Sequence, residues 1–414
     1  MKPALEIDIR RLEREIEELA QISENPPPAV TRVLFSDADL KARAWVKNLF
    51  QEAGLKVRQD AVGNVFARWE GRDPTAPAIA TGSHIDAIPN AGKYDGVVGV
   101  LGGLEAIRSL QRIGFQPARS IELIVFTAEE PTRFGIGCLG SRIMSGTLDD
   151  QKIASLRDRD GNDLDFCRRR ASVEGEINSA RIGGGKFAGF VELHIEQGPV
   201  LEREKISIGI VEKIAAPSSL RLRLTGVGGH AGAVLMPDRR DALLAGAEIA
   251  LAVEKAALTS GSADTVATTG VFRIEPGAVN SVPCAAHLEI DLRDTNLVSR
   301  DAALSRIETA AEETCIRRGI TLQLERVNAD APAICDAKLV EMAGQICDEL
   351  KISSTKLISR AYHDTLFMSR ICPTTMIFIP CRGGVSHRPD EYSSPEQIEC
   401  GVRVLAEVLR ELAG

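Results

Sequence analysis

The sequence predicts an α/β protein of two domains, one inserted into the other, and three observations support this fold class. Apolar, β-branched runs such as 120–126 alternate with helical patterns, which is typical of a mostly parallel, mixed sheet covered on both faces. Residues 213–328 instead follow the order βαββαβ of ferredoxin-like domains. The β/α alternation resumes at 329, so we expect 1–212 and 329–414 to form one domain around the insertion.

Each element follows from its local pattern. Helices are predicted where apolar residues recur every three to four positions, and strands where short β-branched or aromatic runs lie between turn residues. The predicted helices are 4–23, 38–54, 97–113, 241–257, 302–318 and 395–412. The predicted strands are 56–59, 64–69, 78–82, 120–126, 190–194, 220–224, 264–274, 285–292, 321–327 and 375–379. Residues 145–188 are poorly periodic and predict a helical excursion with loops.

Composition excludes several classes of protein. With 414 residues, 44% of them hydrophobic, the chain is able to bury a large core. Its net charge of −8 and its aromatic content of 4% argue against a nucleic-acid-binding surface. No apolar run is long enough to span a bilayer, and residues 1–18 lack the apolar core of a signal peptide. Nine cysteines without a Cys-x-x-Cys pair indicate free thiols, so we expect a cytoplasmic protein.

The most informative stretch is 81–96, which follows the predicted strand 78–82. It places His84 and Asp86 at the carboxyl end of that strand, and Asp95 follows in Lys-Tyr-Asp between two glycines. This edge of an α/β sheet is where ligands bind. An imidazole with two carboxylates suits a divalent cation. Taken alone, His-x-Asp also fits a hydrogen-bonded turn.

Two adjacent acids, Glu129 and Glu130, follow the predicted strand 120–126. Side chains of neighbours in an extended segment point to opposite sides, so we expect the two to have different functions. A cation bound by one carboxylate relieves their repulsion and leaves the other free as a base. The alternative is an acidic helix N-terminus that interacts with the helix dipole.

Two more histidines, His194 and His387, also lie at or after the carboxyl end of a predicted strand. His194 lies where a strand ends in a glycine turn, and His387 lies in a glycine-loosened loop after strand 375–379. Singly, they fit a structural histidine and an exposed loop histidine. Together with the acids above, they supply enough ligands for two cations about 3.5–4 Å apart that share a carboxylate and a water.

The remaining three histidines differ in their surroundings. His287 lies inside a predicted strand and is expected to be structural, whereas His363 follows Tyr362 and is able to face the site. His230 belongs to the insertion, and its flanking glycines indicate a backbone that approaches another group closely.

Six motifs together resemble the dinuclear-metal amidohydrolases, the family that includes N-carbamoyl-L-amino acid hydrolases, β-ureidopropionases, allantoate amidohydrolases and ureidoglycolate amidohydrolases. The resemblance runs over nearly the whole chain. It rests on Gly-Ser-His-Ile-Asp (82–86), Tyr-Asp-Gly (94–96), Glu-Glu (129–130), Leu-His-Ile-Glu-Gln-Gly-Pro (193–199), Gly-His-Ala-Gly (229–232) and Ser-His-Arg-Pro (386–389).

The resemblance implies a role for each site residue. It assigns one cation to His84 and His194, the other to Glu130 and His387, and both to a bridging Asp95. It further implies that Glu129 is the general base, that Asp86 orients His84, and that the insertion is a lid and dimerisation domain. Its His230 would enter the partner subunit's site and stabilise the oxyanion. The expected substrate-binding residues are Gln197, Asn280, Arg293, Tyr362, His363 and Arg239, and for Arg293 the guanidinium fork itself suits a carboxylate.

Within the family, the sequence is most similar to plant-type ureidoglycolate amidohydrolases. Most relatives carry Gly-Ala-Gly-His-Asp where this chain has Ser359-Arg360-Ala361-Tyr362-His363-Asp364. Carbamoylases usually carry Thr-Thr-Pro-Met where it has 233–237. We therefore expect hydrolysis of the ureido group of (S)-ureidoglycolate. The first alternative is an N-carbamoyl-L-amino acid hydrolase, β-ureidopropionase or allantoate amidohydrolase with the same chemistry. The others are a non-catalytic metal-binding module and a dipeptidase-like enzyme with the same metal core.

The cofactor and partners follow from the same resemblance. We expect two divalent cations per subunit, with manganese favoured and zinc or cobalt also suited to the mixed ligands. The expected partners are a small ureido-carboxylate substrate and a second copy of the chain, with neither nucleic acid nor a membrane.

Overall fold

The computed structural model describes residues 3–414 and divides into two compact units. Unit 1 comprises 3–212, Ile334–Leu357 and His363–Gly414, and unit 2 comprises Lys213–Ala333 and Ile358–Tyr362. Unit 2 contains the predicted insertion 213–328 and also takes in 358–362, which we had assigned to the first domain. The cause is local pairing: the Ser359 carbonyl accepts a hydrogen bond from the Ala215 N–H at 2.8 Å. The first two of residues 1–18 lie outside the described residues.

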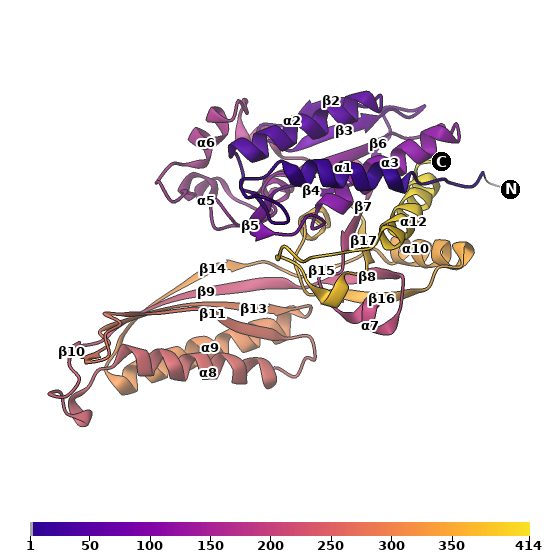
Figure 1. Cartoon of the computed structure of the whole chain (residues 1–414). Helices are drawn as coiled ribbons and strands as arrows, with labels where there is room; N and C mark the ends of the chain where they lie inside the picture. Colours follow the sequence, from indigo (N-terminus) through magenta and orange to yellow (C-terminus); the bar gives the residue numbers. More distant parts are fainter. Residues whose placement is uncertain (1–2) are drawn as a thin grey trace. The chain divides into compact units, whose positions relative to one another are not determined.

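A nine-stranded mixed sheet runs through unit 1 (Figure 1). Its strands pair in the order β15 (Ala333–Ile334), β8 (Ile208–Ile214), β17 (Thr374–Ile379), β7 (Phe187–Ile195), β4 (Ala78–His84), β6 (Ile121–Phe126), β3 (Val65–Trp69) and β2 (Lys56–Gln59), with β16 (Ser354–Ser359) on β8. The four strands β17, β7, β4 and β6 are parallel. The pairs β17–β8, β3–β6 and β2–β3 are antiparallel, so parallel pairing is concentrated at the centre of the sheet rather than extending across most of it.

Helices cover both faces of this sheet. On β4, Thr81 and Ser83 face α3, whereas Ala80 packs with Met144 of α4 and Met368 of α11. Helix α12 packs beside α3, and α1 and α10 pack on this pair. The helices of unit 1 are α1 (Ile9–Gln21), α2 (Asp37–Glu52), α3 (Val97–Arg112), α4 (Leu139–Met144), α5 (Asp150–Ser155), α6 (Leu164–Arg170), α7 (Val200–Glu204), α10 (Ala337–Leu350), α11 (Asp364–Met368) and α12 (Pro395–Ala413), with 3₁₀ turns Ile177–Ala180 and Arg382–Gly384.

Two parts of unit 1 differ from the predicted elements, the start of the first helix and a small sheet, whereas the predicted excursion 145–188 is helical as expected. Helix α1 begins at Ile9 rather than at residue 4, because the Asp8 side chain caps it by accepting a hydrogen bond from the Arg11 N–H. The excursion 145–188 contains α5, α6 and a 3₁₀ turn, and its Ile153 and Leu164 pack in a core cluster with Leu34, Val62 and Leu139 of unit 1. A two-stranded sheet of β1 (Val30–Arg32) and β5 (Ala87–Ala91) was not predicted.

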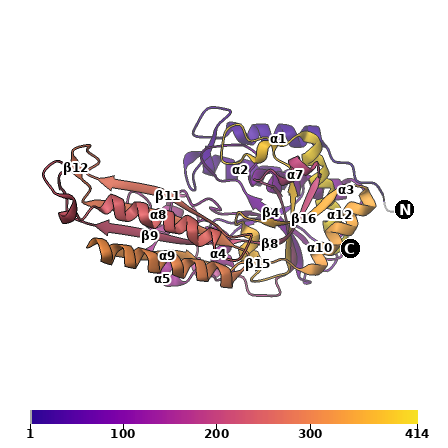
Figure 2. The same ribbon diagram turned by 90° about the horizontal axis from the view of Figure 1, so that it is seen from below.

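Unit 2 is a four-stranded antiparallel sheet with two helices on one face (Figures 1 and 2). Its elements are β9 (Ala216–Thr225), β10 (Gly229–His230), a 3₁₀ turn (Met236–Asp238), α8 (Ala242–Leu258), β11 (Val266–Glu275), β12 (Ser281–Val282), β13 (Ala285–Asp294), α9 (Leu297–Arg318) and β14 (Thr321–Ala329). The strand order β11-β13-β9-β14, with the chain order βαββαβ, is that of a ferredoxin-like fold. Leu222, Leu288 and Ile290 point toward the helices and pack with Ile249 and Ile307.

Two further sequence expectations concern membrane-spanning helices and the state of the cysteines. In the part of the chain that the structure describes, no helix combines the length and the apolar character needed to cross a bilayer. All nine cysteines are free thiols, as their spacing predicted.

Candidate metal centre and active site

The candidate metal ligands of unit 1 lie at one edge of the central sheet. His84 ends β4, and His194 stands one residue before the end of β7. Glu129 and Glu130 follow β6, and His387 follows β17. Because these four strands are parallel, their carboxyl ends meet at the same edge, where α/β sheets place their ligand sites.

The first group able to hold a cation consists of His84, Asp95 and His194. The Asp95 Oδ1 atom lies 3.3 Å from Nε2 of His84 and 3.2 Å from Nε2 of His194. All three residues are buried. Two imidazole nitrogens and a carboxylate oxygen therefore converge on one point that is shielded from water.

Hydrogen bonds to the backbone determine the tautomers of both imidazoles. Nδ1 of His84 lies 3.0 Å from the Asp86 carbonyl, and Nδ1 of His194 lies 2.9 Å from the Ile195 carbonyl. A carbonyl only accepts, so each Nδ1 carries the proton and each Nε2 presents a lone pair. Among the described residues, the buried Nε2 of His84 has no hydrogen-bond partner.

A lone pair that faces a carboxylate oxygen in a buried site needs a positive charge between them. The pKa of His84 reflects this need: burial opposes the charged ring, but the carboxylates of Glu129 and Asp95 outweigh burial and raise the pKa well above its ordinary value. A divalent cation satisfies the same need. The residues present therefore fit a metal ion.

A second group is formed by Asp95, Glu130 and His387. Nε2 of His387 lies 3.2 Å from Oε1 of Glu130 and 3.5 Å from Oδ2 of Asp95. The hydrogen bond with Glu130 raises the pKa of His387 to about 9. Asp95 thus directs Oδ1 to one group and Oδ2 to the other, which is the arrangement of a carboxylate bridging two cations.

Asp86 belongs to neither group and ties the ligand segments together. Its carboxylate accepts backbone N–H bonds from Glu129 at 3.2 Å and from Glu130 at 3.0 Å. Burial raises the pKa of Asp86 to about 6. The expected orientation of His84 is achieved by the Asp86 carbonyl, since the Asp86 Oδ1 atom lies 3.7 Å from Nδ1.

Glu129 stands beside the ligands rather than among them. Its Oε2 atom lies 3.8 Å from Nε2 of His84, whereas the neighbouring Glu130 faces His387. Ala128 has a φ of 51°, so the chain turns sharply before this pair. Burial raises the pKa of Glu129 well above its ordinary value, which increases its affinity for a proton.

Three residues from distant segments support the bridging Asp95. Oδ2 of Asp95 accepts hydrogen bonds from Nε2 of Gln197 and Oγ of Ser386, both at 2.6 Å. Glu391 accepts the backbone N–H groups of Tyr94 at 2.8 Å and Asp95 at 3.0 Å, and also bonds Ser386 at 2.9 Å. Burial, followed by the charge of Asp95, raises the pKa of Glu391 to about 7. Neither Ser386 nor Glu391 was predicted as a site residue, because nothing in their local sequence points to Asp95.

Gln197 was expected to contact substrate. Its Nε2 atom is used by Asp95, but its Oε1 atom is buried and has no hydrogen-bond partner among residues 3–414 that the structure describes. The amide therefore keeps one acceptor for a ligand.

The glycine after Asp95 is required by the first cation group. Gly96 has a φ of +66°, and a Cβ atom there would lie 2.5–2.6 Å from the ring of His84. Any side chain at this position would displace the imidazole, so the backbone conformation and the close approach both require glycine.

His363 lies directly behind the first group. Its ring centroid is 4.5 Å from that of His194, and the residue is buried. Glu192, His194 and His363 also lie close enough to hold a cation, but the Glu192 oxygens already accept hydrogen bonds from Ser83 at 2.6 Å and Thr365 at 2.5 Å. His363 therefore packs against a ligand of the first group, and its predicted contact with substrate stays a prediction.

The five predicted site residues of unit 2 form two separate sets. The Asn280 carbonyl accepts the Ala231 N–H at 2.8 Å, next to His230, and Arg239 donates to the Ala231 carbonyl at 2.5 Å. Arg293 lies near the far end of β13, with its guanidinium 5.6 Å from the ring of Tyr362. The strand from 285 to 293 separates the sets by about 27 Å at roughly 3.4 Å per residue.

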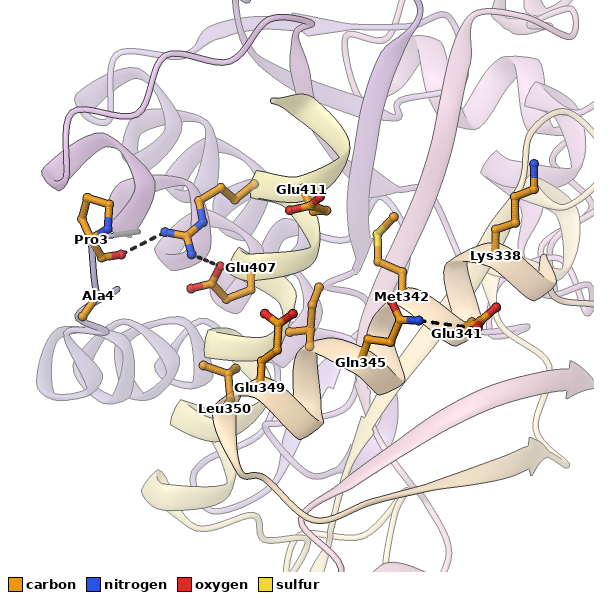
Figure 3. A pocket seen from close by; sticks show the side chains of 12 residues that line it. Pro3, Ala4, Lys338, Glu341, Met342, Gln345, Glu349, Leu350, Glu407 and Glu411 are labelled. Atoms are coloured by element: carbon orange, nitrogen blue, oxygen red, sulfur yellow. Dashed lines mark hydrogen bonds and ion pairs between the residues drawn. The ribbon is translucent and has the colours of Figure 1, made fainter. Parts of the chain in front are cut away.

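A separate hollow of about 670 Å³ in unit 1 lacks the chemistry of this site (Figure 3). It lies between α10 and α12, and Arg410 there donates to the Pro3 carbonyl at 2.9 Å and pairs with Glu407. Its lining contains no histidine or cysteine. None of the predicted site residues lines it.

Comparison with known proteins agrees with the geometry. Residues 80–411 match the peptidase family M20/M25/M40. The chain is 50% identical to ureidoglycolate hydrolase of Arabidopsis thaliana over 99% of this chain and 88% of that protein. It is 36% identical to N-carbamoyl-L-amino acid amidohydrolase of Geobacillus stearothermophilus over 97% of this chain and 98% of that protein. The crystal structure of AtUAH in complex with glyoxylate superposes with a TM-score of 0.93 at 50% identity and covers 99% of both chains. The resemblance inferred from the motifs is confirmed, and the chain belongs to the peptidase family M20/M25/M40.

Proposed function

We propose that this chain is a hydrolase of linear C–N bonds that cleaves the ureido group of (S)-ureidoglycolate. The products are glyoxylate, carbon dioxide and two molecules of ammonia. The observation that carries the proposal is the pair of cation groups that share Asp95, with Glu129 beside them, in a chain 50% identical to a ureidoglycolate hydrolase.

The site residues divide into ligands and a base. His84 and His194 would hold one cation, Glu130 and His387 the other, and Asp95 both. Two divalent cations in such a site polarise a carbonyl and lower the pKa of bound water. We favour manganese from the family likeness, and zinc or cobalt also suits these nitrogen and oxygen ligands.

Glu129 carries the proton transfers. It accepts a proton from the water that attacks the ureido carbonyl and passes that proton to the departing nitrogen. The first C–N bond breaks and releases ammonia, which leaves a carbamate. The carbamate then loses carbon dioxide by breaking its remaining C–N bond, and hydroxyglycine results. Hydroxyglycine then loses ammonia to give glyoxylate, and AtUAH has been crystallised with glyoxylate and with (S)-hydroxyglycine.

Unit 2 supplies the groups for substrate selection. Arg293 uses its Nε for Asp291 at 2.8 Å and one Nη for the Arg360 carbonyl at 3.2 Å, and its other donors suit a carboxylate. The adjacent Tyr362 would bind the α-hydroxyl group. His230 would stabilise the oxyanion, and Asn280 and Arg239 would position the amide, as would Gln197 of unit 1.

The separation of these groups favours a homodimer. One small substrate cannot contact both His230 and Arg293 of the same chain across about 27 Å of β13, so we propose that His230, Asn280 and Arg239 serve the partner's site. Helix α8 presents an exposed apolar row at every seventh residue, Leu244, Leu251 and Leu258, with exposed fractions of 40%, 68% and 80%. Such a stripe is typical of a protein interface, and β11 adds a free sheet edge. A cytoplasmic location is proposed from the nine free cysteines.

A substrate panel tests the function. We expect the kcat/KM for ureidoglycolate, with manganese, to exceed that for N-carbamoylglycine by about 100-fold or more, because a site built around a hydroxyl group rejects its absence. Tyr362→Phe should reduce the activity on ureidoglycolate and leave that on N-carbamoylglycine unchanged. Equal rates on both substrates, or a preference for allantoate or another N-carbamoyl amino acid, would overturn the assignment. Absence of turnover with manganese and with zinc would favour the non-catalytic module.

A further inference from the structure

Four polar side chains form a row across the sheet of unit 2. Arg273 on β11, His287 on β13, Arg223 on β9 and Gln323 on β14 stand directly opposite one another in register. Adjacent strands lie about 4.8 Å apart, so the two arginines are about 10 Å apart at their backbones. The preceding residues on β9 and on the other strands point toward α8 and α9, so the row occupies the sheet face that these helices leave uncovered.

The two arginines of this row form no ion pairs with residues that the structure describes. One step along the sheet, Arg221 lies between Glu289 at 3.3 Å and Glu325 at 3.2 Å. By contrast, Arg223 and Arg273 are exposed, and neither forms a side-chain hydrogen bond or an ion pair with a residue that the structure describes. Like charges on one sheet face repel each other, and an anion bound between them would relieve that repulsion.

The row lines a hollow of about 500 Å³, which is the size of a small-molecule site. Thr225 contributes a hydroxyl group to the lining, and Glu275 is its one carboxylate. The Glu275 side chain forms no ion pair with a described residue, so it reduces the positive charge of the hollow without blocking either arginine. The ring of His287 is held by Glu289, with Nε2 3.0 Å from Oε1.

We infer that this row is a binding site for a small dianion, either a dicarboxylate or a phosphate, that both arginines contact. Each guanidinium is able to bind one oxyanion through two N–H groups, and the spacing of the arginines suits one molecule that spans His287. Gln323 and Thr225, which also line the hollow, offer neutral hydrogen-bonding groups to the same ligand. The site lies wholly within unit 2, and its residues are distinct from those assigned to catalysis.

Thermal unfolding and calorimetry at constant ionic strength test the inference. Succinate and inorganic phosphate are the probes, acetate is the monoanion control, and potassium chloride holds the ionic strength constant. We expect saturable binding of one or both probes by the wild type and an increase in Tm, with acetate much weaker. Which probe binds more tightly identifies the oxyanion.

Variants separate this site from the metal centre. Arg223→Gln combined with Arg273→Gln should weaken binding at least tenfold, and Glu275→Gln should tighten it several-fold. Without a probe, the double variant should unfold at the wild-type temperature or above, because repulsion is relieved. The matched control is Arg326→Gln, on the same strand as Gln323, whose arginine is paired with Glu308 at 2.6 Å and should not affect binding. Equal responses of the wild type and the double variant, or of Glu275→Gln and the wild type, would overturn the inference.

Discussion

The metal centre of unit 1 and the predicted substrate groups of unit 2 are built in opposite ways. Apart from the exposed His387, the first is buried, and strand ends and backbone hydrogen bonds hold its ligands, as for His84 and His194. The second is partly or fully exposed, and His230 and Asn280 lie in a short β-bridge region rather than in the main sheet. Burial makes the charges of the first interdependent, whereas solvent screens those of the second. Substitutions among the buried residues of the metal centre should therefore be less additive than substitutions among the substrate groups of unit 2.

The largest effect is expected for Glu129→Gln. Turnover should fall by about 10²–10⁴-fold or more with both metals retained, because the variant loses only a proton acceptor. Glu130→Gln, one residue on, is the matched control and should lose metal first. Metal analysis after dialysis and kcat for both variants check this. Equal loss of metal in the two variants would show that Glu129 is a ligand.

The next effect concerns His230. His230→Ala alone should be nearly inactive, as should Glu129→Gln alone. Refolded or exchanged 1:1 mixtures should recover about a quarter of the wild-type activity, since half of the dimers would carry one intact site of two. Activity of the mixture that equals the sum of the parents would place His230 outside the partner's site.

A smaller effect is expected for Glu391, which contacts Asp95 through the backbone and through Ser386. Glu391→Ala should weaken metal affinity about 10–100-fold. Glu391→Gln should retain most of it, because its amide still accepts the two N–H groups and donates to Ser386. Chelator competition measures the affinity, and the electron paramagnetic resonance of two manganese ions reports their coupling through Asp95. The exposed Glu396→Ala is the control, and wild-type affinity in Glu391→Ala would contradict the role.

The smallest effect is expected on the surface of unit 2, at Glu248. Hydrogen bonds with Arg318 and Arg317 lower its pKa to about 2 from an ordinary 4.5. A lowered pKa stabilises the fold above pH 4.5, and this contribution is lost as the pH falls toward 2. For this partly exposed pair we expect less than about 1 kcal/mol. The free energies of unfolding of Glu248→Gln and the wild type should differ at pH 7 and converge near pH 2, and a constant difference would exclude the ion pairs as its cause.

Much of the fold is predictable from local sequence. The β-branched run 120–126 forms β6, and Pro395 after a capping serine begins α12. Helix α9 begins at Leu297 rather than 302, because Asn296 caps it with two hydrogen bonds that periodicity does not reveal. The strands β8 and β16 were not predicted, since their pairing is decided by tertiary contacts.

The metal ligands of the site could be predicted from the sequence, but the residues that support them could not. The metal ligands could be inferred because each stands at the end of a strand or in a glycine turn. Ser386 and Glu391 could not, because 291 and 296 residues separate them from the Asp95 groups that they bond. Their roles arise only when the chain folds. For the same reason, the sequence could not reveal the register that aligns Arg273, His287 and Arg223.

The two backbone hydrogen bonds that Asp86 accepts have a consequence for how such enzymes diversify. They fix the positions of Glu129 and Glu130 relative to the turn that carries His84. The base and these metal ligands therefore form one rigid unit. Substitutions among the substrate groups of unit 2 leave that rigid unit unchanged. The same reaction centre is thus able to serve relatives whose names record different substrates, such as ureidoglycolate hydrolase and N-carbamoyl-L-amino acid amidohydrolase.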